Sequence, residues 1–323
     1  MRHFFITLGL ISILIGQQYD QLFVGTRPLS MGGAFIAVAD DANTISWNPA
    51  GLPGLRRTEF TTTYADLWAM GITQSYLGFV RPFSDRVALG FDWSNIGYDD
   101  KELLYSDNKM NLAVGIQLHR KFAFGLTLKY LMRDMQLDGT SYGKSSGIGY
   151  DAGLLIQPLK NLKMGLGLYD LGGTQVAYKD KSTEIILGQA FKLGISYMPI
   201  DGLTLAADYG DRYHFGAEYI YASRISFRAG IQQDIDGNEK IMVPSAGLSI
   251  KFKSIVVEYG YESHPYLNPN HRISLALQLS PAVVSITSTV ISHNPIFRSL
   301  HRYYESEPFV KVGLKNISDA DLP

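Results

Sequence analysis

The side chains of this sequence that could bind a metal ion are seven histidines and thirty acidic residues, and their spacing argues against a metal centre. No two histidines lie at a metal-binding spacing within one predicted element. Residues 234–239, Asp-Ile-Asp-Gly-Asn-Glu, superficially resemble a calcium loop but lack ligands at alternate positions through to a terminal glutamate. A hairpin turn around Asp236-Gly237 explains this stretch better. We therefore expect no metal and no cofactor.

The sequence also lacks the groupings that support enzymatic catalysis. It contains no Gly-x-Ser-x-Gly elbow and no Ser-His-Asp grouping that could form a triad. It has no cysteine, which excludes disulfides, thiolate metal sites and a thiol nucleophile. Gly32-Gly33 is not a nucleotide-binding loop, because no Lys-Ser/Thr follows it and no helix-plus-sheet unit frames it. These observations predict a protein that is not an enzyme.

Composition indicates a folded, β-rich protein. The 323 residues carry a net charge of −1, and 46% are hydrophobic, which is too apolar for disorder and too neutral for nucleic-acid binding. The 20 tyrosines, 16 phenylalanines and 32 glycines favour strands with aromatic surfaces.

Residues 1–16 are predicted to be a secretory signal peptide. Arg2 and His3 form a short basic region, and residues 4–15 form an apolar stretch too short to span a membrane comfortably. A buried N-terminal strand or helix is the alternative. The signal peptide predicts export to the bacterial outer membrane.

From Arg57 onwards the hydrophobic pattern has a period of two, which is typical of strands with one apolar face. In residues 122–134, for example, Phe124, Leu126 and Leu128 alternate with glycine and polar residues. Fourteen such segments are predicted, each close to the length of a tilted membrane-spanning strand: 57–66, 72–81, 86–96, 109–118, 122–134, 147–156, 162–170, 188–198, 202–209, 212–221, 224–234, 242–252, 254–262 and 271–279.

The connections between these segments alternate between short turns and mostly longer polar loops. The short set includes residues 82–85, 119–121 and 222–223, and the longer set includes residues 97–108 and 135–146. This sorting is typical of an outer-membrane barrel, with short turns in the periplasm and longer loops outside. We therefore predict an all-β transmembrane barrel of about 14 antiparallel strands over residues 57–280.

The polar face of the strands is predicted to line the lumen, because a barrel this wide cannot be filled by small side chains alone. Its charged members include Asp92, Lys129, Asp208, Glu218, Arg228 and Glu258. These charges could line a ligand path, or they could pair with one another in a structural network. We favour the network, because charges of both signs that face each other across a barrel usually pair.

Residues 17–56 precede the barrel and are predicted to form a hatch inside its lumen. The residues assigned to sealing or gating are Gly32, Gly33, Asp40, Asp41, Trp47, Asn48, Pro49 and Gly51. The glycine pair permits positive φ or close packing, and Pro49 restricts Asn48 to extended geometry. The acidic pair is assigned to helix capping or hydrogen bonds to the barrel wall. An ionic contact to Arg228 or Lys129 is the alternative.

Residues 281–323 depart from the barrel pattern. They contain an alternating run at 283–291 and a strand at 309–314. Two strands cannot bury a core. The region is therefore predicted to be a periplasmic tail or the start of a truncated β-domain.

Residues 25–52 resemble the N-terminal motif of the FadL-like outer-membrane proteins. The matching stretches are Gly-Thr-Arg-Pro-Leu-Ser-Met-Gly-Gly-Ala at 25–34, Ala-Val-Ala-Asp-Asp-Ala at 37–42 and Trp-Asn-Pro-Ala-Gly-Leu at 47–52. The Ala-Asp-Asp-Ala run and the tryptophan before Asn-Pro-Ala-Gly-Leu are more similar to the PorV/PorQ branch than to the fatty-acid transporters. The resemblance implies a 14-stranded barrel with an internal hatch over roughly residues 22–280.

The resemblance leaves two functions open, with outer-membrane lipid as a partner in both and nucleic acid in neither. The PorV branch serves type IX secretion, which implies a non-enzymatic component in protein export or surface attachment, with envelope or secreted proteins as partners. The alternative is a channel for hydrophobic small molecules such as long-chain fatty acids. An outer-membrane enzyme is the least supported reading, because no inward Ser-His-Asp grouping is apparent.

Overall fold

The computed structural model describes residues 24–100, 103–178, 183–235, 241–279, 284–291 and 310–316. The chain forms two units, Met1–Gln278 and Leu279–Pro323, and each is described by itself. The predicted signal peptide and the predicted turn at Asp236-Gly237 lie outside the described residues.

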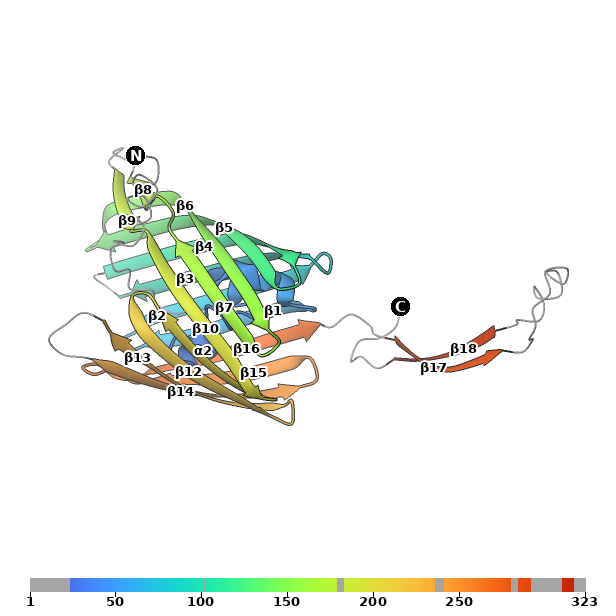
Figure 1. Ribbon diagram of the computed structural model, residues 1–323. Helices are drawn as coiled ribbons and strands as arrows, with labels where there is room; N and C mark the ends of the chain where they lie inside the picture. Colours follow the sequence, from blue (N-terminus) through green and yellow to red (C-terminus); the bar gives the residue numbers. More distant parts are fainter. Residues whose placement is uncertain are drawn as a thin grey trace, which may run out of the picture. The chain divides into compact units, whose positions relative to one another are not determined.

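Within the described part of the first unit, fourteen antiparallel strands form a closed ring (Figure 1). Each strand pairs with the next strand of the ring, and β1 pairs with β16 to close it. The prediction of a 14-stranded barrel is confirmed. The ring consists of β1 (Thr58–Leu67), β2 (Ile72–Pro82), β3 (Val87–Asp99), β4 (Leu103–His119), β5 (Phe122–Leu137), β6 (Thr140–Leu159), β7 (Leu162–Tyr169), β10 (Ala190–Ile200), β11 (Leu203–Tyr209), β12 (Arg212–Tyr221), β13 (Ile225–Asp234), β14 (Met242–Phe252), β15 (Ile255–Glu262) and β16 (Asn270–Leu279).

The prediction of long loops at residues 97–108 and 135–146 is wrong, because strands β3 to β6 continue through both stretches. Strands β4, β5 and β6 contain 17, 16 and 20 residues and occupy most of residues 97–108 and 135–146. Asp138 and Gly139 join β5 to β6 with φ values of 50° and 72°, the left-handed pair of a tight hairpin turn. The short β8 (Thr174–Tyr178) and β9 (Thr183–Leu187) extend this wall from β6. The polar residues in these two stretches therefore belong to extensions of the strands and not to loops.

Side chains along each strand alternate between a buried polar face and an exposed apolar face. On β5, Leu126 and Leu128 are 46% and 45% exposed, whereas Thr127 and Lys129 are 2% and 3% exposed. A water-soluble barrel would bury the leucines and expose the lysine. The outer surface of this ring is therefore suited to lipid.

The second unit contains a pair of antiparallel strands, β17 (Val284–Ile291) and β18 (Val310–Asn316). Both lie where the sequence predicted strands. Among the described residues, no helix has both the length and the apolarity to cross a membrane.

Candidate functional site

The N-terminal segment, residues 24–55, lies inside the ring and contains the residues predicted to form the hatch (Figure 1). It has two short helices, α2 (Thr26–Ser30) and α3 (Thr44–Trp47), and a 3-10 helix η1 (Pro49–Gly54). Gly32 and Gly33 follow α2 with φ values of 61° and 79°, a conformation that glycine adopts without strain. The glycine pair thus turns the chain back along the inner wall.

Asn48 connects distant parts of this segment to one another and to the wall. Its backbone is extended, at φ −157° and ψ 98°, as the following proline requires. The side-chain Nδ2 donates to the carbonyl oxygens of Ile36 (2.8 Å) and Leu154 (3.2 Å), and Oδ1 accepts from the amide of Ala50 (3.1 Å). Next to it, Trp47 Nε1 donates to the carbonyl of Val24 at 3.1 Å. These bonds fix the fold of the segment around one buried amide.

Apolar side chains of the segment form a core with residues of the barrel wall. Phe35 and Trp47 pack edge to face with ring centroids 5.9 Å apart. Tyr76 of β2 and Tyr169 of β7 belong to the same cluster and are at most 2% exposed. Tyr169 Oη donates to the carbonyl of Trp47. The hydrophobic core of this barrel is therefore built around the segment itself.

Glycines on the inner face of the wall allow the segment to approach the strands closely. A Cβ added at Gly125 would lie 2.5 Å from the amide nitrogen of Ala50, and one at Gly216 would lie 2.5 Å from the carbonyl oxygen of Met31. Real Cβ contacts are longer, so these wall positions require glycine. We call this set the glycine lining: Gly90, Gly115, Gly125, Gly153, Gly165, Gly194, Gly216, Gly230, Gly247 and Gly260.

Three wall carboxylates hold the segment by hydrogen bonds. Asp208 accepts from the backbone amides of Phe35 and Ile36 at 2.7 and 2.8 Å. Glu59 accepts from the amide of Ala42 (2.9 Å), and Asp92 accepts from the hydroxyl of Ser46 (2.7 Å). These bonds satisfy backbone and side-chain donors that have no helical partner, as burial requires.

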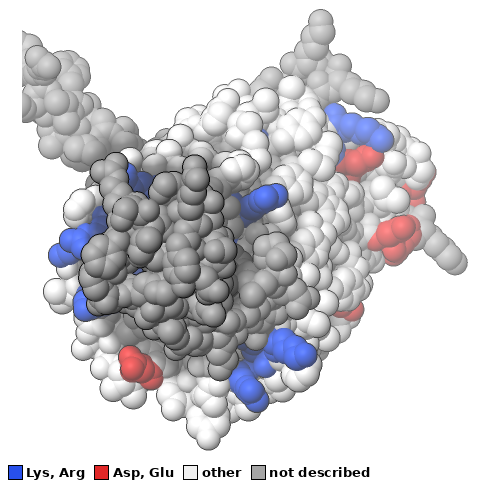
Figure 2. Space-filling view, turned by 90° about the vertical axis from the view of Figure 1, so that its right-hand side faces the viewer, with Lys and Arg blue, Asp and Glu red and all other residues white. Residues whose placement is uncertain are grey.

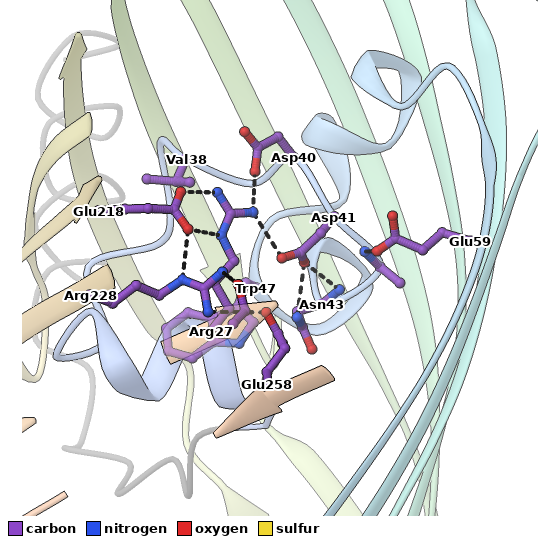
Figure 3. Close-up of polar contacts among 12 residues, drawn as sticks. Arg27, Val38, Asp40, Asp41, Asn43, Trp47, Glu59, Glu218, Arg228 and Glu258 are labelled. Carbon is purple, nitrogen blue, oxygen red and sulfur yellow. Dashed lines mark hydrogen bonds and ion pairs between the residues drawn. The ribbon is translucent and has the colours of Figure 1, made fainter. Parts of the chain in front are cut away.

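Arg27 is the centre of an ion-pair network between the segment and the wall (Figure 3). Its guanidinium donates two hydrogen bonds to Glu218 of β12, at 2.9 and 2.6 Å, and one each to Asp40 (2.6 Å) and Asp41 (2.9 Å). Burial alone would lower the pKa of Arg27, but the three surrounding carboxylates outweigh it and hold that pKa above its ordinary value. Arg27 is therefore a permanent cation.

The network continues across the wall. Arg228 of β13 donates to Glu218 at 2.6 Å and lies 3.0 Å from Glu258 of β15. Glu218 is thus shared by two arginines and is 1% exposed. We call Arg27, Asp40, Asp41, Glu218, Arg228 and Glu258 the Arg27 network.

Each predicted site residue is buried except Asp40, which is exposed. Pro49 lies against the glycine lining, and Gly51 lies so close to the carbonyl of Ala39 that a Cβ there would overlap it. Lys129 does not join the Arg27 network. It pairs within the wall, at 2.7 Å from Asp151 and 2.5 Å from Asp170.

The alternative of an ionic contact from the acidic pair to Arg228 or Lys129 is wrong. Asp40 and Asp41 instead form ion pairs with Arg27 of their own segment. Local sequence reasoning missed Arg27 and Glu59. Arg27 is separated from Glu218 by 191 residues, so no spacing rule relates them. A signal for the glycine lining was present, since glycines recur at inward positions of successive strands.

A cavity of about 360 Å³ opens beside the Arg27 network. It is lined by equal numbers of cationic and acidic residues, including Arg57, Glu59, Arg224 and Lys251. Within the described residues, no group of three or more His, Cys, Asp or Glu side chains could hold a metal ion. The arrangement is that of an internal segment anchored to the barrel wall.

Solved structures with a similar fold include two toluene transporters and a FadL homologue. The toluene transporter TbuX of Ralstonia pickettii superimposes with a TM-score of 0.59 at 13% identity, over 80% of this chain and 99% of TbuX. A FadL homologue of Pseudomonas aeruginosa gives 0.54 at 12% identity, over 79% and 98% of the two chains. The Pseudomonas putida toluene transporter TodX gives 0.55 at 12% identity, over 81% and 98%.

These likenesses concern the fold: a closed antiparallel barrel like those of the two toluene transporters and the FadL homologue. No protein-family model matches the sequence. No curated protein matches it either.

Proposed function

We propose that the protein is a bacterial outer-membrane barrel of the FadL type that passes small hydrophobic molecules, with the N-terminal segment as its hatch. The observation that carries this proposal is the fold, which covers nearly the whole length of two toluene transporters. The exposed apolar face of the strands would lie in the membrane, with the short turns in the periplasm. Residues 1–16 would direct export and then be removed.

The proposed membrane location makes a prediction about Leu126 on the outer face. Leu126→Arg is expected to destabilise the barrel by about 2–4 kcal/mol, because it places a charge near the bilayer midplane. Leu126→Phe keeps the site apolar and is the control. The fraction that retains heat-dependent gel mobility in vesicles measures the effect. Equal stability of the two variants would contradict burial of this face in lipid.

The proposed transport is tested by uptake in a bacterial host that lacks channels for hydrocarbons. Cells that produce the barrel are expected to take up radiolabelled toluene or oleate faster than control cells, with no change for a sugar. A folded barrel that leaves uptake of both hydrophobic probes unchanged would argue against a channel.

A role in protein export is the second candidate. It is favoured by the resemblance of the Ala-Asp-Asp-Ala and Trp-Asn-Pro-Ala-Gly-Leu stretches to the PorV/PorQ branch. Both stretches are almost entirely buried in the N-terminal segment, where Trp47 and Asn48 anchor its fold. Purification from native membranes distinguishes the candidates: a stoichiometric envelope or secreted protein favours export, and bound hydrocarbon or lipid in a barrel without partners favours transport.

A further inference from the structure

A second cavity, of about 560 Å³, opens at the short-turn end of the barrel and is distinct in charge from the first. It lies between the N-terminal segment at Gly51 and Gly54 and the turns that join β2 to β3 and β4 to β5. We call it the basic cavity, because its lining includes Arg56, Arg86, His119, Arg120, Lys121 and Lys163. Its acidic lining residues are Asp40 and Asp85.

The cations of the basic cavity are only partly neutralised by the protein. Asp40 binds Arg27 at 2.6 Å, and Asp85 lies at 3.4 Å from Arg56 with both side chains in solvent. In the described part of the chain, neither Arg86 nor Arg120 has a carboxylate within ion-pair distance. Figure 2, which views this end, shows Lys and Arg side chains on it together with Asp and Glu side chains. The cavity therefore has an excess of positive charge available to a ligand.

The outer surface beside the cavity is apolar. Phe83, on the turn that follows β2, is 66% exposed, and Leu118, near the end of β4, is 59% exposed. Leu159, at the end of β6, is 60% exposed. A cationic pocket with apolar side chains on its membrane side is suited to a ligand that has an anionic head and acyl chains.

We propose that the basic cavity binds a phosphate group, supplied by the headgroup of an anionic phospholipid in the leaflet at the short-turn end. Arg86 and Arg120 present planar guanidinium groups, which match phosphate oxygens in a bidentate manner. A volume of about 560 Å³ accommodates such a headgroup. This inference rests on the proposed membrane location and not on what the barrel transports.

The test is lipid binding to the full chain in a neutral detergent, counted by native mass spectrometry. Wild-type protein is expected to retain dioleoylphosphatidylglycerol in preference to dioleoylphosphatidylcholine, and the double variant Arg86→Gln/Arg120→Gln is expected to bind it about tenfold more weakly. The control Arg224→Gln/Lys253→Gln removes the same charge from exposed positions at the same end, outside the basic cavity, and should bind as wild type does.

Titration with inorganic phosphate distinguishes a lipid headgroup from a soluble phosphate ion as the ligand. Displacement of the lipid by millimolar phosphate supports a site that recognises the phosphate group, whereas phosphate binding without lipid binding assigns the site to a soluble anion. Equal binding of the two lipids, or equal loss of binding in both double variants, would overturn the proposal. Heat-dependent gel mobility confirms that each variant is folded. If lipid binding fails while hydrocarbon uptake is normal, the lipid proposal is wrong and the proposed transport function is unaffected.

Discussion

Gly125→Val is expected to displace the N-terminal segment from the wall while the barrel stays folded. A Cβ at this position would overlap the carbonyl carbon of Pro49 and lie 2.5 Å from the nitrogen of Ala50. Both atoms belong to backbone, which cannot rotate away as a side chain can. Overpacking of this kind costs about 1–3 kcal/mol, and here the rigid neighbour favours the upper end. Valine itself is favourable in a strand, so β5 should remain paired.

The absence of cysteine from the chain provides a clean reporter for this displacement. Ala37→Cys places a single thiol at a fully buried position of the segment, where a membrane-impermeant maleimide should react slowly. Adding Gly125→Val is expected to accelerate labelling, with heat-dependent gel mobility unchanged. Gly54→Val is the matched control, because no atom lies within 4 Å of a Cβ at Gly54. If both glycine variants label alike, close approach to the wall does not hold the segment.

The barrel could be predicted from sequence because strand alternation is a local property. The alternation of apolar and polar residues shows that Leu126 and Thr127 lie on opposite faces of a strand, and each short turn marks the end of a strand. The extensions of β3 to β6 could not be predicted in this way, because polar residues such as Ser106, Asp107 and Asn108 interrupt the alternation of apolar and polar side chains there. There the hairpin is set by the two left-handed residues Asp138 and Gly139, which are also common in loops.

The candidate site was less predictable than the barrel, because most of its contacts join residues far apart in the sequence. The positive φ of Gly32 and the extended backbone of Asn48 follow from glycine and proline, so the shape of the segment was partly predictable. The contacts of Arg27 and Asp208 depend on where distant strands meet the segment, which sequence spacing does not encode. Several inward carboxylates contact the segment: Glu218 forms an ion pair with Arg27, and Asp208 accepts a hydrogen bond from the amide of Phe35.

Arg27→Met is expected to loosen the segment more than Glu218→Gln does. Arg27 joins three carboxylates, and its removal leaves Asp41, 10% exposed, without its cation. Breaking a buried ion pair from one side costs about 3–5 kcal/mol. In Glu218→Gln, Arg27 keeps Asp40 and Asp41, Arg228 keeps Glu258, and the amide oxygen can still accept a hydrogen bond.

The labelling rate of the thiol introduced by Ala37→Cys measures how much each of the two variants loosens the segment. If reaction proceeds through opening of the segment, a loss of about 3 kcal/mol raises the rate roughly a hundredfold. High salt should raise the rate little when Arg27 is present, because buried pairs are poorly screened. Similar slow labelling with and without Arg27→Met would show that the apolar core around Phe35 and Trp47 retains the segment without the ion pairs. A rapid rate in Arg27→Met with normal mobility would instead show that the Arg27 network holds the segment in place, since the strands and the glycine lining are unchanged in that variant.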